Sequence, residues 1–581
     1  MLFESPGLPE EWHGRSHYTL LEADFGDGVN FVRLWERWKQ DTARPKRLHV
    51  VALLPSLLDA QTLRTRLRAQ TSNALHGRVD QLVSQWPLNL PGTHRLDFED
   101  LAVTLTLAVG PVEVTVPRLA IVVDAVLFSG SQASSLAALT PVWQKNLPRL
   151  VRDPARVCLA FAEGTRVRGC LSLNVFSDVS TGAGAVGRTS TEAQGSTDRM
   201  IRRTFAQQDS KQALVIGAGI AGAGVAHALA LRGWRVRVLD VRQRRQQTHG
   251  GHLVAALTPM VTRDDDIRAR LSRAGSLRAQ SRWSQVSQEI VWRCGALQLQ
   301  RVSGRIVDLR DVLEGLALPQ EWVRFVETAE ASDIAGLPLS RGGLYFPTAA
   351  RIQPERLIDA LLAWPGIEHM DVHAERFRRT GGKWEVLDDA GEVCAEAPQL
   401  ILAAAQGTQE LLHRSGLLET CERMPSMHQL GGEITLMPEY ALAGGPRCIV
   451  SGDGYVLPSY KGLCAVGSSY IHGAQQVEPS LTGMQGNVAR AASLLGQAHL
   501  LERFNLAQSG DVAGWAGWRA VLPGRLPGIG PVGSEEGLWV VAGFASRGLT
   551  WSSLAGDLIA AALNAEPLPL ERDIMDKISQ T

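Results

Sequence analysis

A glycine-rich segment at residues 213–240 constrains the fold of this chain more than any other feature. It begins with a short apolar run, 213–216, of the kind that forms a buried parallel strand. Gly217, Gly219 and Gly222 follow in the spacing G-x-G-x-x-G. The first glycine permits a tight turn, the second lets a pyrophosphate approach the backbone, and the third lets a helix pack closely on the strand. The segment therefore predicts a dinucleotide-binding turn.

The residues after the turn support this interpretation. A helix is expected over 221–231, with its N–H groups and positive dipole end facing the phosphates. A strand over 235–239 follows and ends at Asp240. An acid roughly 20 residues beyond the turn can accept hydrogen bonds from a ribose. The predicted cofactor contacts in this segment are Gly217, Ala218, Gly219, Ile220, Ala221, Gly222 and Asp240.

A second strand, glycine and helix occur near the C-terminus, with the strand expected over 538–542 and the helix over 551–563. A helix N-terminus that comes from the far end of a domain commonly meets the flavin end of FAD, whereas NAD needs only one contiguous nucleotide-binding half. The pair of turns therefore favours FAD. The predicted contacts at the second turn are Gly543, Gly548, Leu549 and Thr550.

The N-terminal part of the chain contains another strand, glycine turn and helix, with Gly26 and Gly28 in the turn. Strands and helices alternate after it, which is typical of a doubly wound α/β fold. We therefore expect a first domain over 1–177. Residues 178–212 are rich in Gly, Ser, Thr and Ala without periodicity and are expected to be a linker. The second domain is expected over 213–581, with antiparallel strands inserted around 432–467.

Composition narrows the class of protein. The 59 basic and 59 acidic residues balance, so the chain is not a simple polybasic nucleic-acid binder. Seven scattered cysteines without metal-binding spacing suggest reduced thiols of a cytoplasmic protein and no metal site. The N-terminal residues do not form a secretory signal, and no apolar run is long enough for a membrane span.

The second block resembles the FAD-dependent oxidoreductases of the D-amino-acid oxidase and glycine oxidase type. It is closer still to the C-terminal half of the bifunctional tRNA 5-methylaminomethyl-2-thiouridine biosynthesis proteins. The first block resembles the S-adenosylmethionine (SAM)-dependent methyltransferase half of that family. The residues that carry the resemblance lie at 21–31, 86–88, 91–95, 105–107, 123–125, 217–222, 342–347, 453–458, 465–470, 517–519, 526–527, 546–549 and 566–570.

The resemblance covers nearly the whole chain except the linker. It implies an α/β protein in which a Rossmann-like methyltransferase fold precedes an FAD-binding Rossmann domain with an inserted antiparallel substrate domain. It further implies that the second domain oxidises the C–N bond of a carboxymethylaminomethyl group on the wobble uridine of tRNA. SAM-dependent methylation of the resulting amine by the first domain would follow. Arg519 is the candidate for holding the substrate carboxylate, because a guanidinium fork suits it; the alternative is a structural arginine that binds a loop carbonyl. Arg547 is expected to orient the flavin or the substrate.

The first block departs from the family pattern at the positions that the resemblance marks as acidic. Residues 51–55 contain no acid to hold a cofactor ribose, Pro111 follows Gly110, and Ser129 stands where an aspartate is expected. A serine hydroxyl does not act as a carboxylate base at neutral pH. These departures favour a degenerate methyltransferase domain, with Gly26 and Gly28 a weak or vestigial SAM site. The alternative function is a small-molecule amine or amino-acid oxidase with a non-catalytic N-terminal scaffold or tRNA-docking domain.

Three further groups of residues allow two interpretations. His249 and His252 are expected to be flavin-loop residues rather than metal ligands. The arginines of a helix expected over 266–292 form either a tRNA-facing surface or a solvated helix face. Trp283 and Trp292 are expected in the core rather than as base-stacking platforms.

Overall fold

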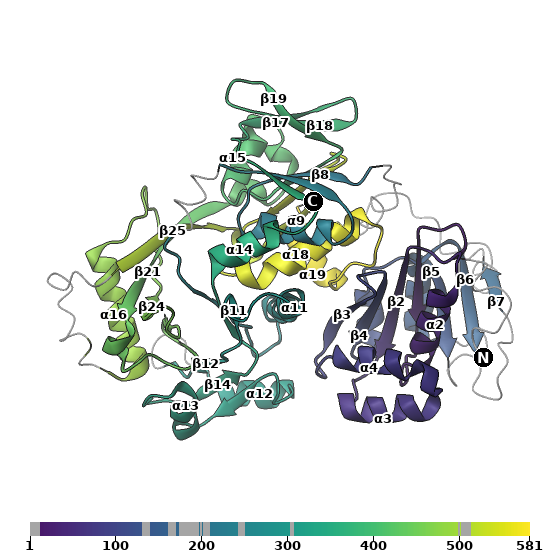
Figure 1. The fold of residues 1–581 in the computed structure, drawn as a ribbon, viewed down its shortest axis with the longest axis horizontal. Helices are drawn as coiled ribbons and strands as arrows, with labels where there is room; N and C mark the ends of the chain where they lie inside the picture. Colours follow the sequence, from purple (N-terminus) through teal and green to yellow (C-terminus); the bar gives the residue numbers. More distant parts are fainter. Residues whose placement is uncertain are drawn as a thin grey trace. The chain divides into compact units, whose positions relative to one another are not determined.

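The computed structural model describes residues 12–129, 140–160, 170–173, 197, 200, 210–241, 250–301, 307–497, 500 and 513–580 (Figure 1). The chain divides into two compact units. Unit 1 contains residues 1–207 and 560–577, and unit 2 contains residues 208–559 and 578–581. The segment 560–577 was predicted as part of the second domain, so the structure differs there from the expected division. The predicted linker falls mostly outside the described residues, and its bounds stay a prediction.

Unit 1 is built on a sheet in which the described strands follow the order β3-β4-β2-β1-β5-β6-β7. The central strands are parallel, whereas β3 and β7 pair antiparallel with their neighbours at the two edges. The strands are β1 (His17–Glu22), β2 (Arg47–Leu54), β3 (Gly92–Phe98), β4 (Val103–Val109), β5 (Val123–Ser129), β6 (Val151–Ala160) and β7 (Cys170–Leu173). The helices are α2 (Val29–Gln40), α3 (Ala60–Gln70), α4 (His76–Ser84), α5 (Val112–Arg118), α6 (Pro141–Leu150) and α19 (Arg572–Ile578).

The core of unit 1 is formed by buried strands and by one face of α2. All residues of β4 and nearly all of β2 are buried, as expected for strands covered on both faces. Helix α2 buries Phe31, Trp35 and Trp38 at helical spacing against one face of the sheet. The core therefore fixes the glycine turn that lies between β1 and α2.

The C-terminal segment of the chain is an integral part of unit 1. The Glu566 carboxylate lies 8% exposed and pairs with Arg47 of β2 and Arg95 of β3. The Leu568 backbone N–H donates to the Ala120 carbonyl, and Leu568, like Ile574 of α19, is buried. Residues from the two ends of the sequence thus share one core.

We expect Glu566→Gln to loosen unit 1, because it leaves the buried Arg95 guanidinium without its carboxylate partner. Removing one partner of a partly buried ion pair should cost about 2 kcal/mol, or about 30-fold faster amide exchange in β3 and β4. Hydrogen-exchange mass spectrometry measures this rate. Asp80→Asn is the control, since Asp80 and its partner Arg68 are both 45% exposed and their pair should contribute little. Unchanged exchange in Glu566→Gln would contradict the expectation.

Unit 2 contains the sheet that carries the glycine turn, with its described strands in the order β16-β9-β8-β20-β27-β26. All pairs are parallel except that between β26 and β27. The strands are β8 (Gln212–Ile216), β9 (Arg235–Leu239), β16 (Ile367–Met370), β20 (Gln399–Leu402), β26 (Gly528–Pro531) and β27 (Leu538–Ala542). The helices of the unit are α9 (Ile220–Ala230), α11 (Ile267–Arg282), α12 (Leu309–Leu316), α13 (Thr328–Ala335), α14 (Pro354–Leu362), α15 (Gly407–Arg414), α16 (Leu481–Leu495) and α18 (Gly548–Leu563), the last of which continues into unit 1.

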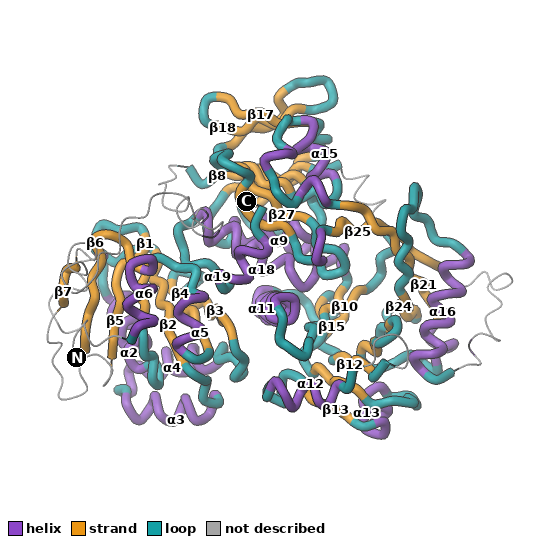
Figure 2. The backbone as a smooth tube through the Cα atoms, turned by 180° about the vertical axis from the view of Figure 1, so that it is seen from behind, coloured by secondary structure: helices purple, strands orange, loops and turns teal. Residues whose placement is uncertain are grey.

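A second, largely antiparallel sheet forms the inserted part of unit 2, and its described strands follow the order β13-β14-β12-β22-β23-β24-β21-β25. They are β12 (Ala296–Leu299), β13 (Arg324–Val326), β14 (Gly343–Phe346), β21 (His428–Pro438), β22 (Ile449–Ser451), β23 (Tyr455–Val456), β24 (Leu463–Gly467) and β25 (Ala513–Val521). Two small sheets complete the unit (Figure 2): β10 (Ala255–Leu257), β11 (Val291–Trp292) and β15 (Ala350–Ile352), then β17 (Arg376–Thr380), β18 (Lys383–Leu387) and β19 (Val393–Ala397).

The fold confirms the α/β class and the inserted antiparallel sheet, and it corrects two local predictions. The helix expected over 266–292 ends at Arg282. Trp292, expected in the core, lies instead in β11 and is 37% exposed.

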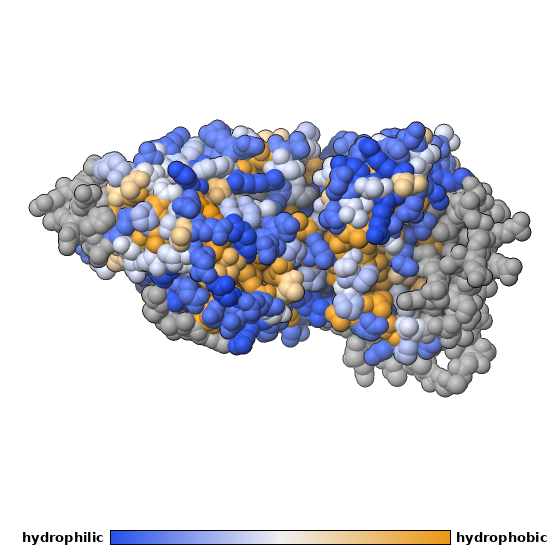
Figure 3. All heavy atoms as spheres, turned by 90° about the horizontal axis from the view of Figure 1, so that it is seen from below, coloured by the Kyte–Doolittle hydropathy of each residue, from blue (hydrophilic) through white to orange (hydrophobic). Residues whose placement is uncertain are grey.

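The surface of the protein is mixed in hydropathy: Figure 3 shows hydrophobic residues between hydrophilic ones on the face it draws. Among the residues that the structure describes, no helix has the length and hydropathy needed to cross a membrane.

Candidate active site

A cavity of about 780 Å³ lies at the carboxyl ends of β8, β9, β20 and β27 in unit 2. Ligands of open α/β sheets bind at this edge. The cavity brings together residues from both predicted glycine turns, although more than 300 positions separate the turns in the sequence. The predicted cofactor residues that line it are Gly217, Gly219, Ile220, Ala221, Asp240, Gly543 and Gly548.

The first turn is shaped by its glycines. Gly217 has a φ of 107°, which favours glycine, and a Cβ there would run into the backbone of Ala403 at the end of β20. A Cβ on Gly222 would overlap the carbonyl oxygen of Gly217. The N-terminus of α9 therefore approaches the end of β8 closely, and no side chain caps it. A cradle of this shape leaves backbone N–H groups for a phosphate and fits the pyrophosphate of FAD.

Asp240 follows β9 on the rim of the same cavity. Its Oδ2 accepts a hydrogen bond of 2.7 Å from the Ala218 N–H, so the acid also stabilises the turn. The other carboxylate oxygen of Asp240 offers an acceptor for a ribose hydroxyl. The position of Asp240 fits the adenosine end of FAD.

We expect Gly222→Ala to weaken FAD binding at least about tenfold, because the methyl group forces α9 away from the turn. The flavin absorbance of the purified protein and a titration with added FAD measure the effect. The matched control is Gly315→Ala in α12, where a Cβ meets no atom within 4 Å and φ is not positive. A Gly222→Ala protein with full flavin content would show that the turn is not a phosphate cradle.

The second turn lies between β27 and α18. Gly543 has a φ of 73°, and a Cβ there would press on Leu522. Leu549 packs in a hydrophobic cluster, and Thr550 is buried where α11 comes so close that a Cβ on Gly275 would overlap the Thr550 carbonyl. The contacts of all the predicted cofactor residues with FAD stay predictions, including those of Leu549, Thr550, Ala218 and Gly222, which do not line the cavity.

A buried ionic cluster joins α9 and α18, the helices that follow the two glycine turns. Asp557 of α18 is fully buried and accepts hydrogen bonds from Arg232, which follows α9, and from Arg278 and Arg282 of α11. The three guanidinium groups hold the pKa of Asp557 well below its usual range, against the opposing effect of its burial. Burial and the nearby Arg282 lower the pKa of His227 to about 4, so this imidazole stays neutral beside the cluster at neutral pH.

The cluster corrects the interpretation of the arginine-rich helix. Arg273 and Arg278 are buried, and Arg273 pairs with Asp265 at 2.8 Å. Helix α11 therefore directs these arginines into unit 2 and presents them neither to tRNA nor to bulk solvent. Arg268 at the start of the helix is half exposed and pairs with Asp266.

Arg519 lies on β25 of the second sheet and lines the cavity. Gly432 on the neighbouring strand β21 makes room for it, because a Cβ at Gly432 would overlap the guanidinium. One nitrogen, Nη1, donates to the carbonyls of Gly431 and Ser469, both at 3.3 Å. Arg519 thus has the carbonyl contacts of a structural arginine and also borders the cavity, where its other donors suit a carboxylate.

Two tyrosines and a second arginine lie beside Arg519. The guanidinium carbon of Arg519 is 4.8 Å from the ring centroid of Tyr470. Burial raises the pKa of the Tyr455 phenol, while Arg519 lowers it, so the phenol keeps its proton at neutral pH. Burial also lowers the pKa of Arg547, whose Nη1 donates to the Thr258 carbonyl at 3.0 Å. Of these residues, Arg519 lines the cavity, and electrostatic interactions link Tyr455 to Arg519 and Arg547 to Tyr470.

His252 packs on an aromatic side chain of the same sheet. Its ring lies 4.2 Å from that of Trp515 with an angle of 11° between the planes. Trp515 is two and four residues before Gly517 and Arg519, so all three face the same side of β25. His249, predicted with His252 as a flavin-loop residue, lies outside the described residues.

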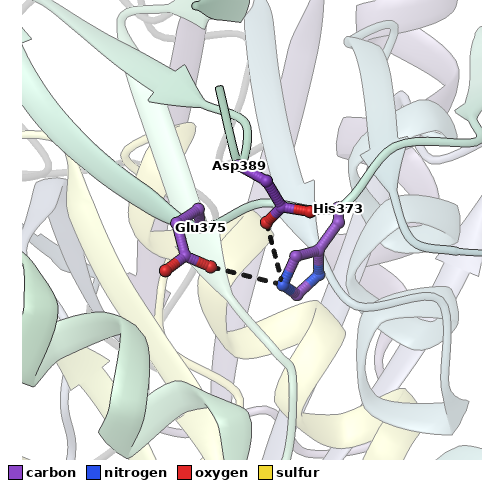
Figure 4. Close-up of side chains that lie close together, drawn as sticks. All are labelled: His373, Glu375 and Asp389. Atoms are coloured by element: carbon purple, nitrogen blue, oxygen red, sulfur yellow. Dashed lines mark ion pairs between the residues drawn. The ribbon is translucent and has the colours of Figure 1, made fainter. Parts of the chain in front are cut away.

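The sequence did not indicate a cluster of three ionisable side chains on the cavity wall. The Nε2 of His373 is 3.5 Å from Glu375 and 3.6 Å from Asp389 (Figure 4). The three side chains could hold a metal ion, but Arg414 of α15 already pairs with Glu375. Asp389 comes from the turn between β18 and β19, so its neighbours could not be inferred from sequence spacing.

The glycine turn of unit 1 is also formed as predicted. Gly26 and Gly28 have φ values of 55° and 79°, and the Phe25 ring fills the space beside Gly28 and stacks on Trp86. At the end of β1, burial raises the pKa of Glu22 to about 8, against the hydrogen bond that Asn30 donates to it. The Glu22 carboxyl at the end of β1 is therefore largely uncharged at neutral pH, whereas Asp27, between the two glycines, pairs with Arg66.

The two turns differ at the end of the following strand. Asp240 follows β9 in unit 2, whereas Pro55 and Ser56 follow β2 in unit 1. Because both strands are the second of a strand, turn, helix and strand unit, these positions correspond in topology. Unit 1 lacks a carboxylate there, as the sequence indicated. Ser129 ends β5, and its side chain lies outside the described residues.

Comparison with known proteins places this geometry in a family. A model of the family "FAD dependent oxidoreductase" matches residues 212–562, which span both turns of the cavity. The chain is 34% identical to the tRNA 5-methylaminomethyl-2-thiouridine biosynthesis bifunctional protein MnmC of Cupriavidus metallidurans, covering 98% of this chain and 89% of that protein. It is 30% identical to the MnmC protein of Paraburkholderia phytofirmans, with coverage of 98% and 90%.

Solved structures share the fold of unit 2. Iminodiacetate oxidase from Chelativorans sp. BNC1 matches with a TM-score of 0.51 at 22% identity, covering 64% of this chain and 99% of that one. Glycine oxidase from Geobacillus kaustophilus matches with a TM-score of 0.50 at 18% identity and the same coverage. Unit 2 therefore has the fold of these oxidases and is an FAD-dependent oxidoreductase domain. From the match along nearly its whole length, the chain belongs to the family of bifunctional tRNA 5-methylaminomethyl-2-thiouridine biosynthesis proteins.

Proposed function

We propose that unit 2 oxidises the carboxymethylaminomethyl group on the wobble uridine of tRNA and leaves an aminomethyl group. The observation that carries this proposal is the placement of Arg519 on the wall of the cavity that the two glycine turns form. The name of the MnmC relatives, which specifies a modified thiouridine of tRNA, supports the choice of substrate. Because the substrate is a tRNA, we propose that the protein acts in the cytoplasm.

Bound FAD accepts a hydride from a carbon next to an amine nitrogen. Arg519 binds the carboxylate of the carboxymethyl group and so orients the methylene carbon that loses the hydride. Loss of the hydride and of the amine proton leaves an imine, which water hydrolyses to the aminomethyl nucleoside and glyoxylate. Arg547 adds positive charge near Tyr470, and the protonated Tyr455 contributes a hydroxyl donor near Arg519.

Anaerobic mixing of the FAD-loaded protein with tRNA that carries carboxymethylaminomethyluridine tests the proposal. We expect the flavin absorbance to fall and the nucleoside profile to change to the aminomethyl form. An unmodified tRNA transcript is the control substrate. If the tRNA leaves the flavin oxidised while free N-alkyl glycines reduce it rapidly, the protein is a small-molecule amine oxidase and the proposal is wrong.

For unit 1 we propose a methyltransferase-like module that does not methylate the amine. The absence of a carboxylate after β2, where Pro55 and Ser56 stand, and the largely uncharged Glu22 support this proposal. The ribose of a bound SAM would not find the usual carboxylate acceptor after β2.

Calorimetry with the full-length protein tests the proposal for unit 1. We expect no saturable SAM binding up to about 1 mM, a limit that corresponds to about 4 kcal/mol of binding free energy. The FAD-loaded protein keeps unit 2 intact during the titration. Micromolar SAM binding, or methylated nucleoside after incubation with SAM and aminomethyl tRNA, would contradict the proposal.

A further inference from the structure

We infer that the ring of Tyr470 is a stacking platform for a pyrimidine base of the RNA substrate, next to the arginine that binds its carboxylate. The inference rests on the proposed function, because that function supplies a uracil joined to a carboxylate. The proposed function assigns side chains to the amine and the carboxylate of the substrate. The inference adds a residue that recognises the base.

The backbone around Tyr470 is fixed to the sheet although its side chain is exposed. Gly431 and Ile471 exchange two backbone hydrogen bonds, of 3.1 and 2.9 Å, and the Ser469 N–H donates to the Glu433 carbonyl at 3.1 Å. The Ser469 hydroxyl accepts a further bond of 2.9 Å from the Glu433 N–H. Hydrogen bonds to β21 on both sides of Tyr470 therefore fix the backbone of residues 469–471. A ring on such a backbone loses little conformational freedom when a ligand packs on it.

The exposed ring of Tyr470 lies beside the charged part of the cavity. It is 52% exposed, and the Arg519 guanidinium lies over it at 4.8 Å from the centroid. Large aromatic side chains usually bury most of their surface in a folded protein. A rigid, half-exposed ring with a guanidinium on it has the features by which proteins stack unpaired bases.

The length of the substrate side chain matches this arrangement. Four covalent bonds join the carboxylate carbon of a carboxymethylaminomethyl group to C5 of its uracil, which gives a reach of about 5 Å for an extended chain. With the carboxylate on Arg519, the uracil is confined to the surroundings of the guanidinium. The Tyr470 ring centroid is 4.8 Å from the guanidinium carbon, so the ring borders the region in which the uracil is confined.

Three variants test the inference on the FAD-loaded protein. Tyr470→Leu removes the ring, Tyr470→Phe keeps it, and Tyr440→Leu is the control at a tyrosine that is 71% exposed in another turn. Binding of a fluorescent anticodon stem-loop RNA is followed by anisotropy at constant salt. Flavin reduction is followed with modified tRNA and with N-ethylglycine, which has the amine and the carboxylate but no base.

We expect Tyr470→Leu to weaken RNA binding about tenfold, and to lower the rate constant for tRNA about tenfold more than that for N-ethylglycine. Tyr470→Phe and Tyr440→Leu should stay within about twofold of the unchanged protein. Unchanged RNA affinity in Tyr470→Leu would overturn the inference. An equal fall in the rate constant of flavin reduction with tRNA and with N-ethylglycine would also overturn it, because the ring would then act only through Arg519. If RNA affinity falls when the Tyr470 ring is removed but modified tRNA does not reduce the flavin, the stacking platform is supported and the proposed function is wrong.

Discussion

Asp557→Asn is expected to destabilise unit 2 by about 3–5 kcal/mol, because it leaves three buried guanidinium groups without their carboxylate. Asp557 is fully buried, and Arg232, Arg278 and Arg282 are at most 10% exposed. The cluster joins α18 to α9 and α11, so its loss should also separate the two turns that form the cavity. Urea unfolding followed by flavin fluorescence measures both effects, since FAD leaves the protein when unit 2 opens.

The control for Asp557 is Glu327→Gln, which removes the carboxylate of an exposed pair with Arg310. That substitution should change stability by less than about 1 kcal/mol. Because the folded-state pKa of Asp557 is depressed, its contribution is present above the unfolded pKa of about 4 and is lost as the pH falls further. The difference between Asp557→Asn and the unchanged protein should therefore shrink below about pH 4, and a constant difference would contradict this account.

Arg519→Met is expected to lower the rate of flavin reduction by carboxylate-bearing amines about 100-fold, or by about 3 kcal/mol. The substitution keeps much of the side-chain volume but removes the donors that we assign to the carboxylate. Arg519→Lys should recover part of the activity, because an ammonium keeps the charge but not the two-pronged geometry. Anaerobic stopped-flow measurements with tRNA and with N-ethylglycine give the rate constants.

Two comparisons separate substrate binding from a structural role of Arg519. Arg356→Lys, at an exposed arginine paired with Glu289, should leave the rates unchanged. An amine without a carboxylate should react equally slowly with the Arg519→Met variant and the unchanged protein. If Arg519→Met instead loses flavin or melts early, the contacts of the guanidinium with Gly431 and Ser469 are its main role.

Local sequence patterns were sufficient to predict the parts of the site that short segments build. The turn at Gly217 and the acid at Asp240 follow from a strand, a glycine spacing and a helix that are contiguous in the chain. The antiparallel sheet around β21 and β24 followed from short apolar runs between glycine turns. Gly26 and Gly28 were predicted in a turn for the same reason, and the structure places them there.

The remaining features depend on contacts between distant segments. The sequence around the arginines of α11 suggests that they are solvated. Nothing near them shows that Asp557, on a helix almost 280 positions away, accepts their hydrogen bonds. Trp292 was expected in the core on composition alone, but an edge position in β11 leaves it partly exposed under Arg351. Tertiary packing likewise brings Asp389, from the turn between β18 and β19, beside His373.

Because the chain returns to unit 1 near residue 560, unit 1 can finish folding only after nearly all of unit 2 has been translated. Residues 560–577 belong to the same compact unit as residues 1–207, but they leave the ribosome only after residues 208–559 of the other unit. Domains usually fold as units from the N-terminus onward. In this chain, the nascent first unit has to wait with an uncovered apolar surface until the oxidoreductase has been translated, so pauses in translation of the second unit prolong the exposure of the first.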